Sequence, residues 1–229
     1  EWVDFILDKD EKEERVARAA LMSAATSNWL GSICQLPISI DSVYKMIEKM
    51  LHVLDPDKKQ WQVQTVQLLF TESFLGSTFF FLDEAILESM ITDRIIPGLL
   101  DQHPDVQDAA SQLLTFVVKS SSVIKDKLPF IVERFIAMLT DKESLSRRIA
   151  GAKGLSSIIM GTLLFDEVPQ YITDSFQALT DAVEVDSSVE NIISQFFSDF
   201  WALYDNNLMQ NIAETLAPYH DSLRPSYFC

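Results

Sequence analysis

The sequence predicts an all-α protein, built as a solenoid of helical hairpins that stack on one another. Apolar residues recur at the spacing of a helix face along almost the whole chain, and convincing strand-like alternation is absent. Short polar breaks separate the helical segments and return at a nearly constant interval, which is typical of a repeat architecture. These three observations favour repeated pairs of helices over a mixed or all-β fold.

The first 40 residues are expected to be the end of a preceding hairpin. The chain begins with Glu1, not Met, and residues 2–7 are an apolar segment with nothing before it to pack on, so we expect a piece of a longer protein. One long helix is predicted over residues 11–35. It begins at a charged turn, residues 10–15, where negative charge complements the helix dipole.

Residues 41–217 are predicted to form four or so helical hairpins and a final helix. Val43, Ile47, Met50 and Leu54 show the periodicity, because residues three, four and seven apart share one helix face. The predicted pairs are 41–54 with 58–76, 84–99 with 105–120, 124–139 with 143–163, and 168–183 with 187–204, and the final helix covers 208–217.

The breaks between these helices carry residues that end one helix and cap the next. They are Asp55-Pro56-Asp57, His103-Pro104-Asp105, Thr140-Asp141 and Asp186-Ser187-Ser188. Asp and Ser cap helix N-termini, and proline cannot continue a preceding helix.

The interval between hairpins indicates the kind of repeat. Val63, Val106, Leu145 and Val189 take equivalent early positions in the second helices, and their separations are 43, 39 and 44 residues. HEAT and armadillo repeats have a period of roughly 40–47 residues. Residues 105–110 also look like the start of a HEAT inner helix, so we predict HEAT-like hairpins.

The composition excludes some classes of partner. A formal charge of −16, from 34 acidic and 18 basic residues, argues against direct nucleic-acid binding, which relies on Lys and Arg to neutralise phosphates. A basic protein or peptide cargo would tolerate this negative charge.

The two cysteines, Cys34 and Cys229, predict no disulfide framework and fit a reducing, intracellular compartment. Apolar stretches are too short or interrupted to predict insertion into a membrane.

The candidate catalytic and metal-ligating residues do not form a constellation. His52, His103 and His220 are far apart in sequence and lack partners at metal-ligand spacing. Cys34 lies among apolar residues, where burial would make its thiol inert. The segment 151–154 lacks the phosphate-loop pattern, and its two glycines favour close helix packing. The sequence therefore predicts a binding protein that is not an enzyme and uses no cofactor or metal.

Phenylalanines form an aromatic stripe near the second predicted helix of the first hairpin. Phe70 and Phe74 lie on that helix, and residues 79–81 follow it. Such a stripe is usually repeat core, although a solenoid can also present aromatics on its concave face to an extended ligand. We favour the core.

Residues 218–229 are predicted to be an extended tail. Pro218 and Pro225 block further helix, and the sequence closes on Tyr227, Phe228 and Cys229. An exposed aromatic pair either folds back on its own last hairpin or inserts elsewhere. Capture of a C-terminal carboxylate, with aromatics filling a nearby pocket, is a known binding mode.

The last forty or so residues resemble the C-terminus of the large HEAT-repeat proteasome activators, the bleomycin-sensitivity family (proteasome activator complex subunit 4-like). The matching positions are Val189 to Phe196, Trp201, Tyr204, Leu208, Gln210 to Leu216, and Tyr227-Phe228-Cys229. Fainter similarity lies at Trp61-Gln62-Val63, Asp105 to Ala110, Ala150 to Ser156, and Pro169. The resemblance covers most of residues 60–229, and only the tail is a functional motif.

This resemblance implies a HEAT dome, in nucleus and cytoplasm, that caps the 20S proteasome core without ATP. The tail would dock between α-subunits of the core and loosen its gate for unfolded or basic protein substrates. Tyr227 would be the hydrophobic position, Phe228 the penultimate aromatic, and the Cys229 carboxylate the partner of a pocket lysine. Phe228 departs from the family's tyrosine, which removes a hydrogen bond worth about 0.5–1.5 kcal/mol. The alternative is a HEAT scaffold of the nuclear-transport-receptor or phosphatase-scaffold type.

Overall fold

The structure, a computed structural model, describes Ser42, Lys45 and residues 61–78, 84–120, 124–162 and 169–205. The regular elements in these ranges are all helices, with no strand among them, so the all-α prediction is confirmed. The predicted helices 11–35 and 208–217, most of 41–54, and the divisions at residues 40 and 217 lie outside the described residues. The chain splits into two compact units, Glu1–Leu113 and Leu114–Cys229, and their boundary falls within one helix, α7.

The first unit contains the helices of the first predicted pairs. In order these are α4 (Trp61–Thr78), α5 (Glu84–Met90), a π-helical segment η2 (Ile91–Ile95), α6 (Ile96–Leu99) and the start of α7 (Pro104–Ser120). The predicted helices 58–76 and 105–120 therefore agree with α4 and α7 to within a few residues. Pro104 takes the first position of α7, where its missing N–H costs nothing.

The predicted helix 84–99 is present, but it is not a regular α-helix throughout. Its middle turn, Ile91–Ile95, is π-helical, and the N–H of Ile96 bonds to the carbonyl of Ile91. Pro97 gives the physical reason, because it has no N–H to donate to Asp93 and its ring crowds that carbonyl. Widening the preceding turn relieves this conflict.

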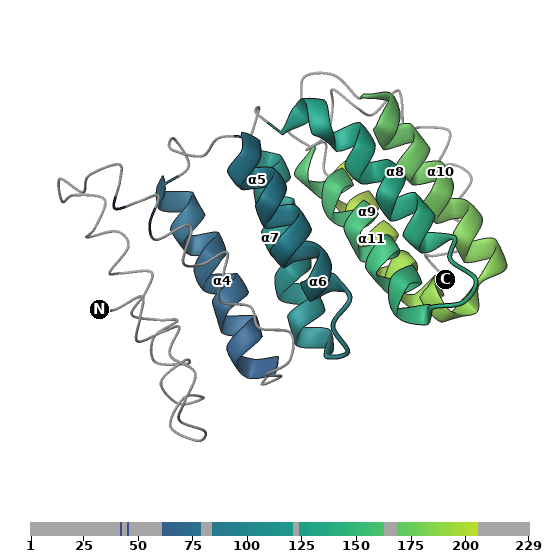
Figure 1. The fold of residues 1–229 in the computed structure, drawn as a ribbon. Helices are drawn as coiled ribbons and strands as arrows, with labels where there is room; N and C mark the ends of the chain where they lie inside the picture. The colour runs from purple at the N-terminus through teal and green to yellow at the C-terminus, as the bar shows by residue number, and fades with distance from the viewer. Residues whose placement is uncertain are drawn as a thin grey trace. The chain divides into compact units, whose positions relative to one another are not determined.

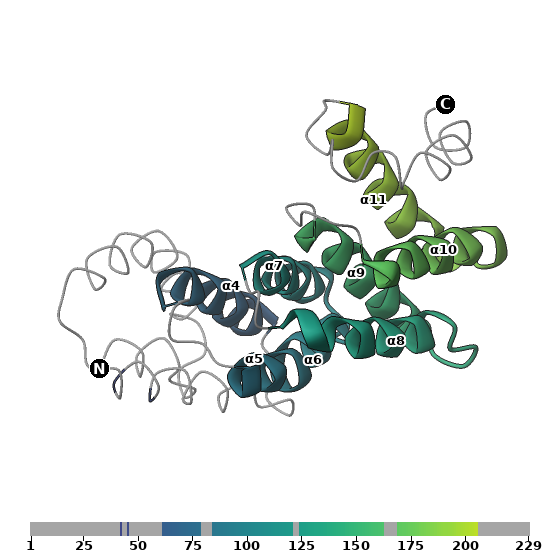
Figure 2. The ribbon, with the colours of Figure 1, turned by 90° about the horizontal axis from the view of Figure 1, so that it is seen from above.

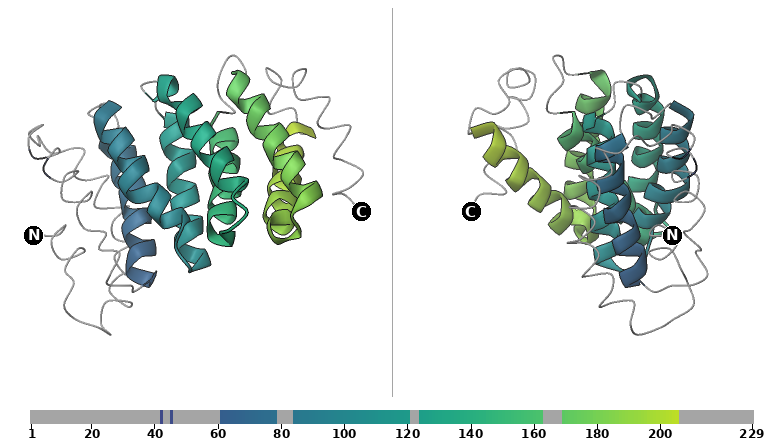
Figure 3. Two further views of the ribbon diagram at one scale, coloured as in Figure 1. Left: turned by 45° about the vertical axis from the view of Figure 1, so that its right-hand side comes forward. Right: turned by 90° about the vertical axis from the view of Figure 1, so that its left-hand side faces the viewer.

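Small side chains bring the helices of the first unit close together. A Cβ placed on Gly98 of α6 would lie 2.8 Å from the Cβ of Ala110 in α7 and 3.4 Å from Leu68 Cδ1 in α4. The α6 backbone therefore lies against both neighbours. At one end of α4, the Trp61 indole stacks on His103, with ring centroids 3.7 Å apart and planes inclined by 4°. Figure 3 shows these helices from two sides.

The second unit contains two predicted hairpins. After the end of α7 its elements are a 3₁₀ turn η3 (Lys125–Lys127), α8 (Leu128–Leu139), α9 (Leu145–Gly161), α10 (Gln170–Val185) and α11 (Ser187–Asp205). The predictions 143–163, 168–183 and 187–204 agree with α9, α10 and α11. Predicted helix 124–139 begins instead with the 3₁₀ turn, because Pro129 is tolerated only in the first turn of α8.

The helices of the second unit pack both within and between hairpins. Helix α8 packs on α9 and α10 packs on α11, while α8 also contacts α10 and α9 also contacts α11. Figures 1 and 2 show the α8–α10 neighbours. Gly151 and Gly154 set the α8–α9 distance, since a Cβ on either would lie 2.4 Å from an α8 atom, Leu139 N or Phe135 Cδ1. The prediction that these glycines serve close packing is confirmed.

An aromatic cluster fills the core between α10 and α11. Phe176 of α10 is fully buried, and its ring centroid lies 5.0 Å from that of Phe200 and 6.0 Å from that of Trp201, both in α11. Phe196 and Phe197 complete the cluster. The tilted and edge-on geometries are those that aromatic quadrupoles favour, so this cluster stabilises the second unit through packing as well as burial.

Candidate functional site

The predicted docking residues Tyr227, Phe228 and Cys229 lie outside the described residues. The same is true of Cys34, His52, His220 and residues 79–81. Phe70 is described and buried, which agrees with the core interpretation.

His103 is the one predicted candidate histidine that the described ranges contain, and its role there is structural. Its Nδ1 accepts a hydrogen bond from the backbone N–H of Asp105 at 3.3 Å, in the turn before α7, while its ring stacks on Trp61. Within the described ranges, His, Cys, Asp and Glu side chains nowhere gather in a group suited to a metal ion. In the same ranges, no helix is long and apolar enough to span a bilayer.

The turns inside the three described hairpins repeat one local arrangement. In each, an aspartate Oδ1 accepts the backbone N–H two residues later: Asp101 from His103 at 2.8 Å, Asp141 from Glu143 at 2.9 Å, and Asp186 from Ser188 at 2.9 Å. These aspartates are 40 and 45 residues apart. Asx turns of this kind hold the chain in a bend without regular structure.

A second feature recurs at two of these turns. A side chain from the first turn of the second helix donates back to the carbonyl of the turn aspartate, from Gln107 Nε2 to Asp101 O at 2.7 Å and from Arg148 Nη1 to Asp141 O at 3.0 Å. The helix start is thereby tied to the turn before it. The recurrence indicates that these hairpins share a structural rule and not only a hydrophobic pattern.

In the second unit, one arginine links the two hairpins. Arg148 of α9 forms an ion pair with Asp186, in the turn between α10 and α11, and Arg147 pairs with Asp141 at 2.8 Å. Hydrogen bonds from Ser188 and the nearby Arg148 hold the pKa of the Asp186 carboxyl below its usual range. Backbone hydrogen bonds from Glu143 and Ser144 lower the pKa of Asp141 in the same direction. These contacts link the two neighbouring hairpins of the second unit.

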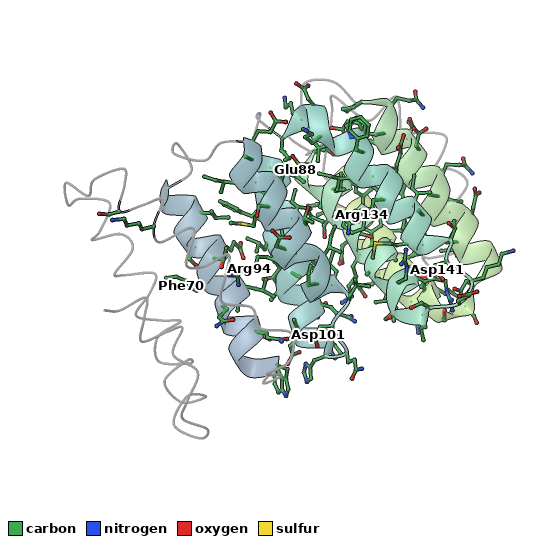
Figure 4. All side chains as sticks on the ribbon, viewed as in Figure 1. Phe70, Glu88, Arg94, Asp101, Arg134 and Asp141 are labelled. Carbon is green, nitrogen blue, oxygen red and sulfur yellow. The ribbon has the colours of Figure 1, made fainter. Side chains whose placement is uncertain are left out.

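The first unit holds a polar side chain of a different kind. Arg94, in the π-helical turn η2, is 3% exposed, and among the described residues its Nε and Nη2 atoms find no hydrogen-bond partner. Burial lowers the pKa of the guanidinium to about 10, an effect that the charge of neighbouring Asp93 opposes. Asp93 itself is exposed and accepts a hydrogen bond from Ser89 Oγ at 2.7 Å. In Figure 4 the Arg94 label lies beside α4.

The interpretation of the sequence missed Arg94, although a signal is present. Leu87, Ile91, Ile95 and Gly98 mark the buried face of the helix, and Arg94 falls three residues after Ile91 and four before Gly98. Periodicity therefore places a permanently charged side chain at a position that ought to be apolar. A cationic residue within an apolar helix face is therefore the sequence pattern that indicates a buried charge.

Comparison of the sequence with models of protein families gives no match, and comparison with curated proteins gives none either.

Proposed function

We propose that the described helices are HEAT-like hairpins stacked as a solenoid. In the second unit, first helices contact first helices and second helices contact second helices, which is the packing by which repeat proteins bury the face each hairpin leaves open. The recurring Asp turns, 40 and 45 residues apart, support the same interpretation. A solenoid of this type is a frame that presents binding surfaces.

We further propose that the protein activates the 20S proteasome core, docking on its α-subunits through Tyr227, Phe228 and Cys229. The observation that carries this proposal is the tail sequence after a helical-repeat body, together with its resemblance to the proteasome activators. Tail binding acts allosterically: it favours the open arrangement of the gate and shifts the population of the core toward it. Hydrolysis then takes place in the core, which is why the chain itself needs no catalytic group.

The test is stimulation of purified 20S core by the 229-residue chain, measured with a fluorogenic peptide. We expect faster cleavage, lost on deletion of residues 227–229 and reduced by Phe228→Ala. Phe228→Tyr, which adds the family's hydroxyl, is the matched control and should stimulate at least as well as the native chain. A peptide copying residues 223–229 should compete, and its C-terminal amide should not. Equal stimulation by the chain without residues 227–229 contradicts the proposal.

The alternative function is a binding scaffold for a basic partner. The distribution of charge along the sequence supports this alternative. No Lys or Arg occurs between Lys153 and Arg224. The exposed aspartates Asp174, Asp181 and Asp199 on α10 and α11 accept hydrogen bonds from glutamines one turn earlier, at 2.7 to 3.0 Å. The partners of these carboxylates in the three contacts are neutral amides, not cations. If the tail deletion leaves binding of a basic protein such as histone unchanged and the core is not stimulated, the scaffold function is supported instead.

A further inference from the structure

We propose that Arg94 is the anchor of a carboxylate-binding site between α4 and the α5–η2–α6 helix, and that the carboxylate comes from a ligand or partner outside this chain. The proposal does not depend on the tail or on the proteasome. It rests on the position, burial and unused donors of one side chain.

The two donors, Nε and Nη2, determine the shape of the group that Arg94 would bind. Nε and Nη2 form one edge of the guanidinium, and their N–H bonds run nearly parallel in a fixed fork. Two oxygens of a carboxylate match this edge, with two charge-assisted hydrogen bonds. A single carbonyl or hydroxyl would satisfy one donor and leave the other buried without a partner.

The group that Arg94 binds must also carry a negative charge. Arginine stays protonated in proteins, and a residue that is 3% exposed has lost nearly all its contact with water. Asp93 does not supply the counter-charge at this edge, because adjacent residues of a helix point in different directions and its carboxylate is exposed and bonded to Ser89. One negative charge balances one guanidinium, so a carboxylate fits better than a doubly charged phosphate, which would leave excess negative charge in the interior.

The surroundings place the site between two helices. Arg94 lies one helical turn before Gly98, whose face packs on Leu68 of α4. Helix α4 also carries two buried polar residues, Gln67 and Thr71, and the Thr71 hydroxyl donates to the carbonyl of Gln67 at 2.7 Å. The π-helical turn that holds Arg94 is a local feature frequently found at functional sites.

The first experiment measures thermal stability of the 229-residue chain in sodium acetate, at ionic strength held constant with sodium chloride. We expect the Tm to rise saturably, by about 2–4 °C. Acetamide, the neutral isostere, should produce no rise. Arg94→Met should fold, as judged by its circular dichroism, and lose the acetate response, while Arg94→Lys should retain a response with an apparent Kd weakened about tenfold. An equal acetate response in Arg94→Met overturns the proposal.

A second measurement identifies the source of the carboxylate. The Arg94 Nε–H resonance, assigned by its loss in Arg94→Lys, should move downfield only on addition of acetate. A resonance already downfield and insensitive to acetate means that a carboxylate of the chain itself occupies the edge, which overturns the ligand site. No change with acetate overturns it as well. Tighter, Arg94-dependent binding of inorganic phosphate than of acetate contradicts the assignment to carboxylate.

Discussion

The two units treat buried polar side chains differently. In the second unit the buried polar residues among those described are hydroxyls, and each donates to a carbonyl of its own helix: Ser157 to Lys153, Thr162 to Ile159, and Ser175 to Tyr171. The described part of the first unit buries longer polar side chains, including Gln107 and Arg94, and two donors of Arg94 have no partner. The buried hydroxyls of the second unit therefore have acceptors within their own helices, whereas the described part of the first unit holds one guanidinium edge for which the described residues provide no acceptor.

The two units also differ in how the charge of a buried or half-buried arginine is compensated. Arg148 is half-buried, yet it reaches Asp186 and the carbonyl of Asp141, so its charge is compensated within the second unit. Arg94 is almost fully buried, and the charge of its exposed neighbour Asp93 favours the protonated guanidinium. Removing one partner of a compensated pair destabilises a protein, whereas removing an uncompensated buried charge relieves a cost. We therefore expect loss of Arg148 to destabilise the second unit, and loss of Arg94 without a ligand to stabilise the first.

The largest effect that we expect tests whether the second unit depends on its apolar core. Phe176→Ala should lower its free energy of unfolding by about 3–5 kcal/mol, because the ring is fully buried among four other aromatic rings. Urea denaturation followed by Trp fluorescence measures this loss. Phe130→Ala is the matched control, since Phe130 is 69% exposed, and it should change stability by less than about 0.5 kcal/mol. Similar losses for both variants would contradict the assigned core.

A smaller loss should follow from widening the α8–α9 contact. Gly151→Ala places a methyl group 2.4 Å from Leu139 N, and a backbone atom cannot turn aside as a flexible side chain can. Overpacking of this kind costs about 1–3 kcal/mol, even though alanine favours the helix. The control is Gly76→Ala at an exposed position of α4, where helix propensity alone should raise stability by up to about 1 kcal/mol. Equal signs for the two variants in denaturant titrations would refute the close contact.

Replacing Arg94 and replacing Arg148 should change the free energy of unfolding in opposite directions. Without ligand, Arg94→Met should raise the stability of the first unit by about 1–3 kcal/mol, because methionine fills similar space without a charge. Arg148→Met should lower the stability of the second unit by about 1 kcal/mol, since it leaves Asp186 without its cation. Hydrogen exchange measured separately over residues 84–113 and 145–205 distinguishes the units. A loss of stability in Arg94→Met means that its charge is already compensated.

For the residues that the structure describes, periodicity and capping residues are enough to predict the helices, because apolar residues recur on one face and the breaks carry Pro, Asp or Ser. They were not enough to predict the π-helical turn, which arises from the effect of Pro97 on a carbonyl one turn earlier. The Arg148–Asp186 pair joins residues 38 positions apart and needs the packing of neighbouring hairpins to be seen. Arg94 was visible as a charge in an apolar stripe, but its burial and its unused donors belong to the tertiary structure alone.

The smallest effect concerns acid. The folded-state pKa of Asp186 and of Asp141 lies below the ordinary value, so both carboxyls contribute stability that is present above the unfolded pKa of about 3.9. That contribution is lost as pH falls from about 4 toward the depressed pKa. Stability of the second unit should therefore decline below pH 4, with a shallower slope in Asp186→Asn and an intermediate slope in Ser188→Ala, which removes one hydrogen bond to Asp186. Denaturant titrations between about pH 5 and 2.5 measure the slopes. Identical slopes in the native chain and Asp186→Asn would show that the turn carboxyl is not held in its charged form by this network.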